Sequence, residues 1–134
     1  MKILTPHANT SISPIKNMLF VLHPWSIKTG NDGSWLAIRD YVVHYRANPR
    51  SVEYMLDLAS DFVGRHAEGA RMELLTHEHL LADLPERHRS WLGGIYTDAD
   101  FSQLSGKNYD TVVLLYHDPI GLGWDDLEKR LKKL

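Results

Sequence analysis

The sequence predicts an α/β protein with a three-layer sandwich of the Rossmann-like or flavodoxin-like type: about four mainly parallel strands with helices on both faces. Short apolar runs of strand length alternate along the chain with segments of helical periodicity. The clearest runs are apolar at every position, which is typical of strands that are covered on both faces. A chain of 134 residues with 43% hydrophobic content can bury one ordinary core, so we expect residues 1–134 to form a single domain.

The N-terminal third contains the first predicted strand and helix. Residues 1–17 are rich in Thr, Ser, Asn and Pro and show no sustained period, so we expect them to be irregular. The apolar run 18–22 predicts the first strand. A loop over 28–34, with two glycines and several potential N-caps, then leads into a predicted helix over 35–46.

The next helix and strand are the most clearly marked. After the break at Pro49, apolar residues recur at helical spacing and share one predicted helix face: Val52, Met55, Leu56, Ala59, Phe62 and Val63. Gly69 supplies a stop for this helix. The loosely alternating segment 71–75 predicts a second strand, which ends at Thr76.

The following segment is less regular. Its leucines predict a short helix over 78–84 and further helical turns over 86–92, separated by a proline. Residues 93–96 predict a third strand. Asp98 is the expected N-cap of a brief helix that Gly106 closes.

The C-terminal part predicts one more strand and a final helix. The segment 110–116 is β-branched and apolar, as expected of a buried strand. A turn over 121–123 leads into a helix over 124–134, whose first turn is acidic and whose last turns are basic. This charge distribution matches the helix dipole.

Charge and composition exclude several function classes. Fifteen basic against seventeen acidic side chains give a net charge of −2, so we expect neither a nucleic-acid partner nor a membrane partner. The longest strongly apolar runs have five residues, whereas a transmembrane helix needs roughly 20. The N-terminus lacks the apolar stretch of a secretory signal, and the chain has no cysteine. We therefore expect a cytoplasmic protein without disulfides or thiolate metal sites.

Polar side chains are concentrated where the predicted strands end. In an open parallel sheet, ligands bind outside the carboxyl ends of the strands, so side chains that follow different strands can converge there. His23 and His117 are the candidate acid–base catalysts, with Asp118 to orient an imidazole, because histidine titrates near neutrality. Adjacent strand residues point to opposite faces, so His117 and Asp118 can share a site only where the strand has already ended.

His77 and His79 are the candidate metal ligands, because imidazole suits divalent metals such as zinc, iron, manganese and nickel. Their spacing places both imidazoles on one side of a strand but not on one face of a helix. The competing interpretation is that eight histidines scattered along the chain leave some near strand ends by chance. A divalent metal is therefore a hypothesis without an established ligand motif.

Two glycine-containing loops favour a small anionic or phosphorylated ligand, because glycine lets backbone N–H groups approach and a helix N-terminus attracts negative charge. The candidate ligand-binding residues are Lys28, Asn31, Asp32, Ser34, Gly121 and Gly123. Neither loop is a P-loop or a complete dinucleotide-binding fingerprint. For the second loop, a turn that needs glycine only to change direction is the competing interpretation.

The function expected from the sequence is binding of such a ligand at the carboxyl ends of the strands, with hydrolase- or transferase-type activity as a further hypothesis. The alternative is a non-catalytic interaction or self-association domain, or one half of a larger nucleotide-using enzyme. Four tryptophans motivate the alternative, since tryptophan anchors many interfaces, including those of homo-oligomers. Trp25 and Trp91 lie next to predicted loops, whereas Trp124 shares the apolar face of the last helix.

Overall fold

The computed structural model describes residues 1–5, 14–22, 49–115 and 129–134. Its strands are β1 (Lys2–Leu4), β2 (Asn17–Leu22), β3 (Arg71–Thr76), β4 (Gly94–Tyr96) and β5 (Thr111–Leu114). Its helices are α2 (Pro49–His66), α3 (Glu78–Leu81), α4 (Glu86–Arg89) and the 3-10 helix η1 (Asp98–Gly106). The predicted helix over 35–46, the turn over 121–123 and the start of the last helix lie outside the described residues.

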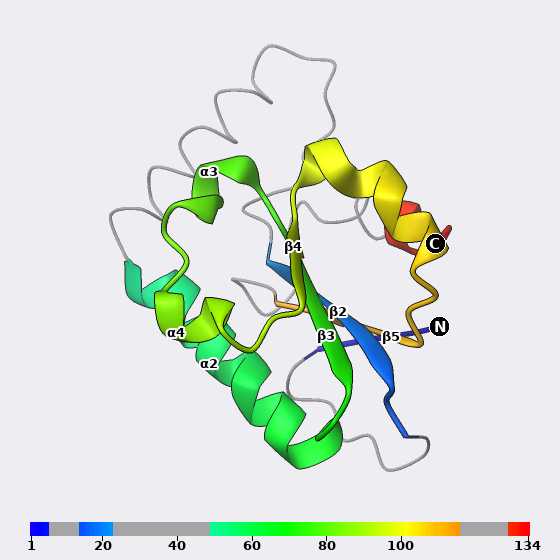
Figure 1. The fold of residues 1–134 in the computed structure, drawn as a ribbon, viewed down its shortest axis with the longest axis horizontal. Helices are drawn as coiled ribbons and strands as arrows, with labels where there is room; N and C mark the ends of the chain where they lie inside the picture. Colours follow the sequence, from blue (N-terminus) through cyan, green and yellow to red (C-terminus); the bar gives the residue numbers. More distant parts are fainter. Residues whose placement is uncertain (6–13, 23–48, 116–128) are drawn as a thin grey trace.

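The strands form one five-stranded sheet in the order β1-β5-β2-β3-β4, and every pair within it is parallel (Figure 1). From β2 the chain proceeds to β3 and β4 on one side, and it then returns to β5 on the other side of β2. The α/β class and the parallel pairing predicted from the sequence are confirmed. Within the described residues no helix is long and apolar enough to cross a bilayer.

The prediction of irregular structure for residues 1–17 is wrong at its beginning, where Lys2–Leu4 form β1. This strand pairs with β5 at the edge of the sheet, and the Lys2 N–H donates to the Asp110 carbonyl at 2.9 Å. Three residues are too few to show a strand period. The strand forms because β5 offers a free edge with which it can pair. This pairing is a tertiary contact, which the local sequence does not reveal.

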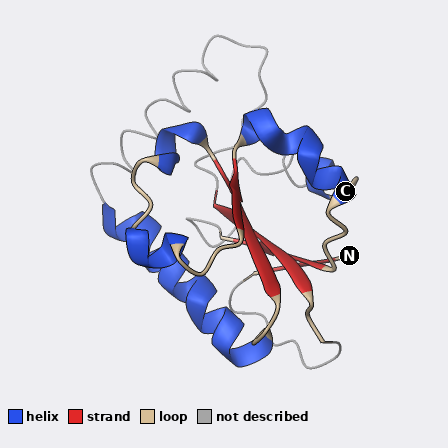
Figure 2. Cartoon of the chain, in the orientation of Figure 1, coloured by secondary structure: helices blue, strands red, loops and turns tan. Residues whose placement is uncertain are grey.

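Two apolar clusters lie on the two faces of the sheet, and β2 contributes to both. Met18, Phe20 and Leu22 belong to the cluster that includes the apolar face of α2. Leu19 and Val21 belong to the cluster that includes Leu104 of η1 and Leu131 near the C-terminus. Figure 2 shows helices on both sides of the central strands. Every residue of 18–22 is fully buried, which explains why this run is apolar at every position.

Helix α2 confirms the clearest helical pattern in the sequence. Five of its six predicted core positions are buried, and Val63 is partly buried against the same cluster. The Ala67 N–H donates to the Val63 carbonyl at 2.9 Å, which closes the last turn. Gly69 has a φ of 83°, a left-handed conformation that glycine adopts without steric cost, and it turns the chain into β3.

For the elements between β3 and β5, the predicted types of structure are confirmed, but the predicted N-cap of η1 is wrong. The short helices α3 and α4 flank Pro85, and η1 ends at Gly106, both as predicted. Asp98 is not the N-cap of η1, however: Thr97 occupies that position, and the Asp100 carboxylate accepts the Thr97 N–H at 3.2 Å. Asp100 lies three residues after Thr97, which is the spacing of a capping box, so Thr97 is the N-cap and Asp98 is the first residue of the helix.

Candidate functional site

The carboxyl ends of the parallel strands lie at one edge of the sheet, where α3 and η1 also begin (Figure 1). Leu22 of β2 is level with Thr76 of β3, and Val21 is level with Leu114 of β5. The Leu115 N–H donates to the Val21 carbonyl at 2.9 Å, so β2 and β5 remain paired up to their ends. We call this edge the carboxyl edge, comprising Leu22, Thr76, Thr97 and Leu115.

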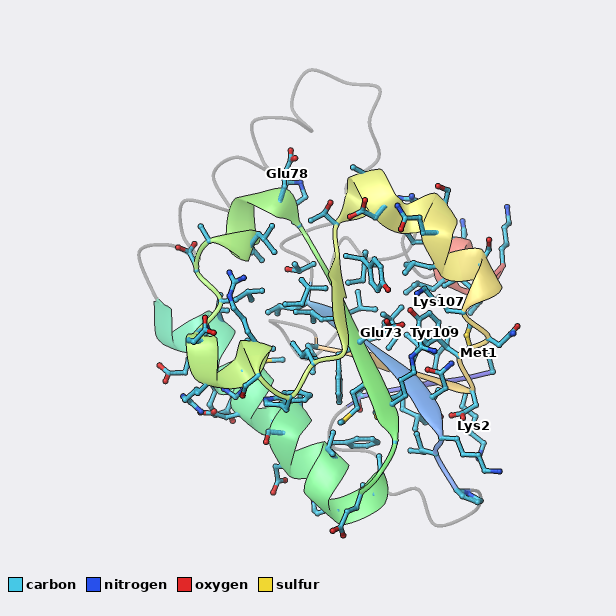
Figure 3. All side chains as sticks on the ribbon, viewed as in Figure 1. Met1, Lys2, Glu73, Glu78, Lys107 and Tyr109 are labelled. Atoms are coloured by element: carbon cyan, nitrogen blue, oxygen red, sulfur yellow. The ribbon has the colours of Figure 1, made fainter. Side chains whose placement is uncertain are left out.

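Three polar side chains of different character follow β3 and β4 at the carboxyl edge. His77 is half-buried directly after β3, and Glu78 is exposed at the start of α3, where Figure 3 places it far from the middle of the sheet. Asp100 is engaged by the Thr97 N–H and by the Gln103 amide. The carboxyl edge therefore combines a histidine and an exposed carboxylate with a carboxylate that already caps η1.

Most of the residues predicted to form the site lie outside the described residues. These are His23, Lys28, Asn31, Asp32, Ser34, His117, Asp118, Gly121 and Gly123. Their roles remain predictions. The strands that precede them are described, and those strands, β2 and β5, are neighbours in the sheet.

The two predicted metal ligands do not have the strand geometry on which their pairing depended. Strand β3 ends at Thr76, so His77 lies beyond it and His79 falls within α3. Among the described residues, no group of three or more potential metal ligands comes together.

A buried carboxylate that the sequence analysis did not single out lies in the middle of the sheet. Glu73 of β3 is 2% exposed. Its Oε1 accepts from the Tyr109 hydroxyl at 2.7 Å, and its Oε2 accepts from the Tyr96 hydroxyl at 2.9 Å. The Arg71 guanidinium lies 3.4 Å from Oε2 and the Lys107 ammonium 4.0 Å from it. Figure 3 shows Glu73, Lys107 and Tyr109 together on one side of β3. We call these five residues the Glu73 cluster.

The Glu73 cluster holds one charged carboxylate and two neutral phenols. Burial acts to raise the pKa of Glu73, but the hydrogen bonds from Tyr109 and Tyr96 and the charges of Arg71 and Lys107 outweigh it, so the pKa lies below its usual range. Burial, followed by the hydrogen bond to Glu73, raises the pKa of the Tyr109 hydroxyl. The Tyr109 phenol is therefore not prepared to act as a base. The hydrogen bonds of the cluster tie β3 to β4 and to the residues before β5.

A second polar network, centred on the buried His88, connects α2 with α4. His88 is 2% exposed, and its Nδ1 accepts from the Trp91 indole N–H at 3.0 Å. Because an indole nitrogen can only donate, His88 must carry its proton on Nε2, which donates to Asp57 Oδ1 at 2.9 Å. The hydrogen bond from Arg87 is the main cause that lowers the pKa of Asp57.

The His88–Asp57 pair resembles the base and orienting carboxylate of many catalytic sites, but both of its ring nitrogens are already engaged. No ring nitrogen is left to receive a substrate proton. Trp91, which the sequence places next to a predicted loop, is only partly exposed and packs edge-on against Phe20 with ring centroids 5.8 Å apart. The network is accordingly structural.

This assignment predicts that Trp91→Phe destabilises the protein by about 1–3 kcal/mol, because it leaves the buried His88 Nδ1 without a donor. Arg87→Gln should cost less than Trp91→Phe, since the Arg87 side chain is 54% exposed and its ion pairs are screened by water. Urea unfolding of both variants provides the comparison. Equal losses, or a smaller loss for Trp91→Phe, would contradict the structural role of the indole hydrogen bond.

No protein-family model, no curated protein and no solved structure matches this chain. The strand order changes direction at β2.

Proposed function

We propose that the chain binds a small anionic or phosphorylated ligand at the carboxyl edge, and that hydrolase- or transferase-type chemistry on this ligand is its activity. The observation that carries the proposal is the strand order, which reverses between β2 and β5 while all strands remain parallel. At such a reversal the two flanking crossover connections depart in opposite directions. Open α/β sheets bind ligands at this point, outside the carboxyl ends of the strands.

A Rossmann-like three-layer sandwich is part of the proposal. Counted from β2, the order β4-β3-β2-β5 is the 3-2-1-4 order of the first strands in that architecture. The apolar clusters on both faces of β2 support helical layers on both sides of the sheet. In this arrangement β1 is an additional edge strand next to β5.

The two glycine-containing segments support an anionic ligand. One segment, with Lys28 and Ser34, follows β2, and the other, with Gly121 and Gly123, follows β5. Because β2 and β5 are paired neighbours, both segments follow strands that end side by side. Backbone N–H groups, a hydroxyl and an ammonium group together suit phosphate oxygens.

The candidate catalytic residues follow the same two strands. His23 comes directly after Leu22 of β2, and His117 and Asp118 come shortly after β5. Strand β5 ends at Leu114, before His117 and Asp118 in the sequence. We propose that one imidazole acts as general acid or base and that Asp118 orients it.

Thermal melting of chelator-treated protein tests the proposal, with inorganic phosphate, nucleotides, sugar nucleotides, phosphorylated metabolites and divalent metals as additives. A ligand at 100 times its dissociation constant should stabilise the wild type by about 2.7 kcal/mol. Lys28→Ala should weaken this stabilisation, whereas Lys16→Ala, at the opposite end of β2, should not.

The panel also separates the alternatives. A shift with a divalent metal alone that His77→Ala and His79→Ala abolish would support the metal hypothesis. If no additive raises the melting temperature, the proposal fails and a non-catalytic interaction or self-association domain becomes the better account.

A further inference from the structure

Almost all buried polar side-chain groups in the described part of the sheet have a hydrogen-bond partner, so a group without one is informative. Thr111, at the amino end of β5, is 2% exposed, and its hydroxyl donates to Asp110 Oδ1 at 2.8 Å. Both carboxylate oxygens of the buried Glu73 accept hydrogen bonds. Burial of a polar group is costly without a hydrogen bond, so folds retain few unpaired ones.

Thr76 is the exception at the carboxyl edge. It is the last residue of β3, it is level with Leu22 of β2, and it is fully buried. Its Oγ1 has no hydrogen-bond partner within the described part of the chain. The only other buried side-chain atom of this kind there is Asn17 Oδ1, which belongs to an amide whose nitrogen donates to the carbonyls of Lys107 and Asn108 at the opposite end of β2.

Within the described residues the Thr76 hydroxyl makes no hydrogen bond that would stabilise β3. Valine has nearly the shape of threonine, favours strands equally, and would bury a methyl group where threonine buries an unpaired oxygen. The neighbouring positions Leu74 and Leu75 are apolar and fully buried, so the surroundings suit valine. The sequence instead places a hydrogen-bonding group at the edge where a parallel sheet binds its ligands.

We infer that Thr76 is a ligand-binding residue whose hydroxyl donates a hydrogen bond to an anionic oxygen, of the phosphate class, at the carboxyl edge. This inference rests on the proposed function and adds to it a specific residue. A hydrogen bond to a charged group that is made only in the complex strengthens binding by about tenfold or more. The same residue leaves the unliganded fold less stable than a valine would, because the hydroxyl is unpaired until the ligand binds.

The test compares Thr76→Val with Thr76→Ser and Thr111→Val, using inorganic phosphate and inorganic pyrophosphate as probes. Melting temperatures are recorded without anion and over an anion titration. We expect Thr76→Val to melt at the wild-type temperature or above without anion, and to bind the anion at least about tenfold more weakly. Thr76→Ser, which keeps the hydroxyl, should retain wild-type affinity. Thr111→Val should lower the melting temperature and leave anion affinity unchanged.

Three results would overturn the inference, and each has a distinct meaning. Anion binding by the wild type with equal affinity in Thr76→Val would reject the role of Thr76 and leave the proposed function standing. A fall of several degrees in the unliganded melting temperature of Thr76→Val would show that the hydroxyl has a structural partner. Absence of any stabilisation of the wild type by either anion would remove the anionic ligand itself, and the inference with it.

Discussion

Gly94→Ala should be among the most destabilising single substitutions in the described part of the chain, with an expected loss of about 3 kcal/mol. A Cβ at Gly94 would lie 2.6 Å from Glu73 Oε2 and 3.0 Å from the Tyr96 hydroxyl. The carboxylate cannot move away cheaply, because it is buried and Tyr109 holds its other oxygen at 2.7 Å. For a domain of this size, the loss corresponds to a fall of roughly 10 °C in melting temperature.

Gly64→Ala is the matched control for this substitution. Gly64 lies in α2, and an added Cβ there would meet no heavy atom within 4 Å. Alanine is a better helix former than glycine, so this variant should gain about 0.5–1 kcal/mol. Urea unfolding at neutral pH gives both values. If Gly94→Ala were as stable as the wild type, the carboxylate would not occupy the position that the structure gives it.

Glu73→Gln should destabilise the protein by about 2 kcal/mol at neutral pH, because it replaces a charged acceptor of two phenol hydrogen bonds with a neutral amide. The substitution also removes the attraction between the carboxylate and the positive charges of Arg71 and Lys107. Glu68→Gln is the control, since Glu68 is exposed just after α2. A surface change of this kind should alter stability by no more than about 0.5 kcal/mol.

The loss in Glu73→Gln should depend on pH in a defined direction. The pKa of Glu73 is lower in the folded protein than in the unfolded chain, so its contribution to stability is complete above the unfolded pKa. The contribution disappears as the pH falls through the lower, folded pKa. The difference in free energy of unfolding between wild type and variant should therefore be largest at neutral pH and shrink below about pH 4. A difference that grew on acidification would contradict the ionised state of the buried carboxylate.

The sequence predicted those elements whose cause is local or periodic. The buried run 18–22 and the apolar face of α2 carry their own pattern, and both were recognised for that reason. Strand β1 and the N-cap of η1 were not, because the first depends on a free edge of β5 and the second on a choice between adjacent capping residues. The local sequence indicates which residues could form a strand or cap a helix, and the contacts in the folded protein determine which of them do so.

The polar interior was less predictable than the apolar one. Glu73 interrupts the apolar part of β3, which is a readable signal, but its partners Tyr96 and Tyr109 lie 23 and 36 residues further along the chain. Nothing in the spacing of these residues indicates that they meet. The unpaired hydroxyl of Thr76 is likewise a property of the packed sheet and not of the residue type. The sequence indicated the strand ends as the place of a candidate site. The contacts of Glu73 and the unpaired state of the Thr76 hydroxyl can be recognised only from the folded sheet.

Backbone hydrogen exchange with and without the anion that gives the largest thermal shift tests the central claim most directly. The claim is that the ligand binds at the carboxyl edge, where β2, β3 and β5 end. We predict slower exchange on binding for peptides that contain Leu22, Thr76 or Leu115 together with the residues that follow them. Slower exchange confined to the opposite end of the sheet, around Lys16, Arg71 and Lys107, would contradict the claim.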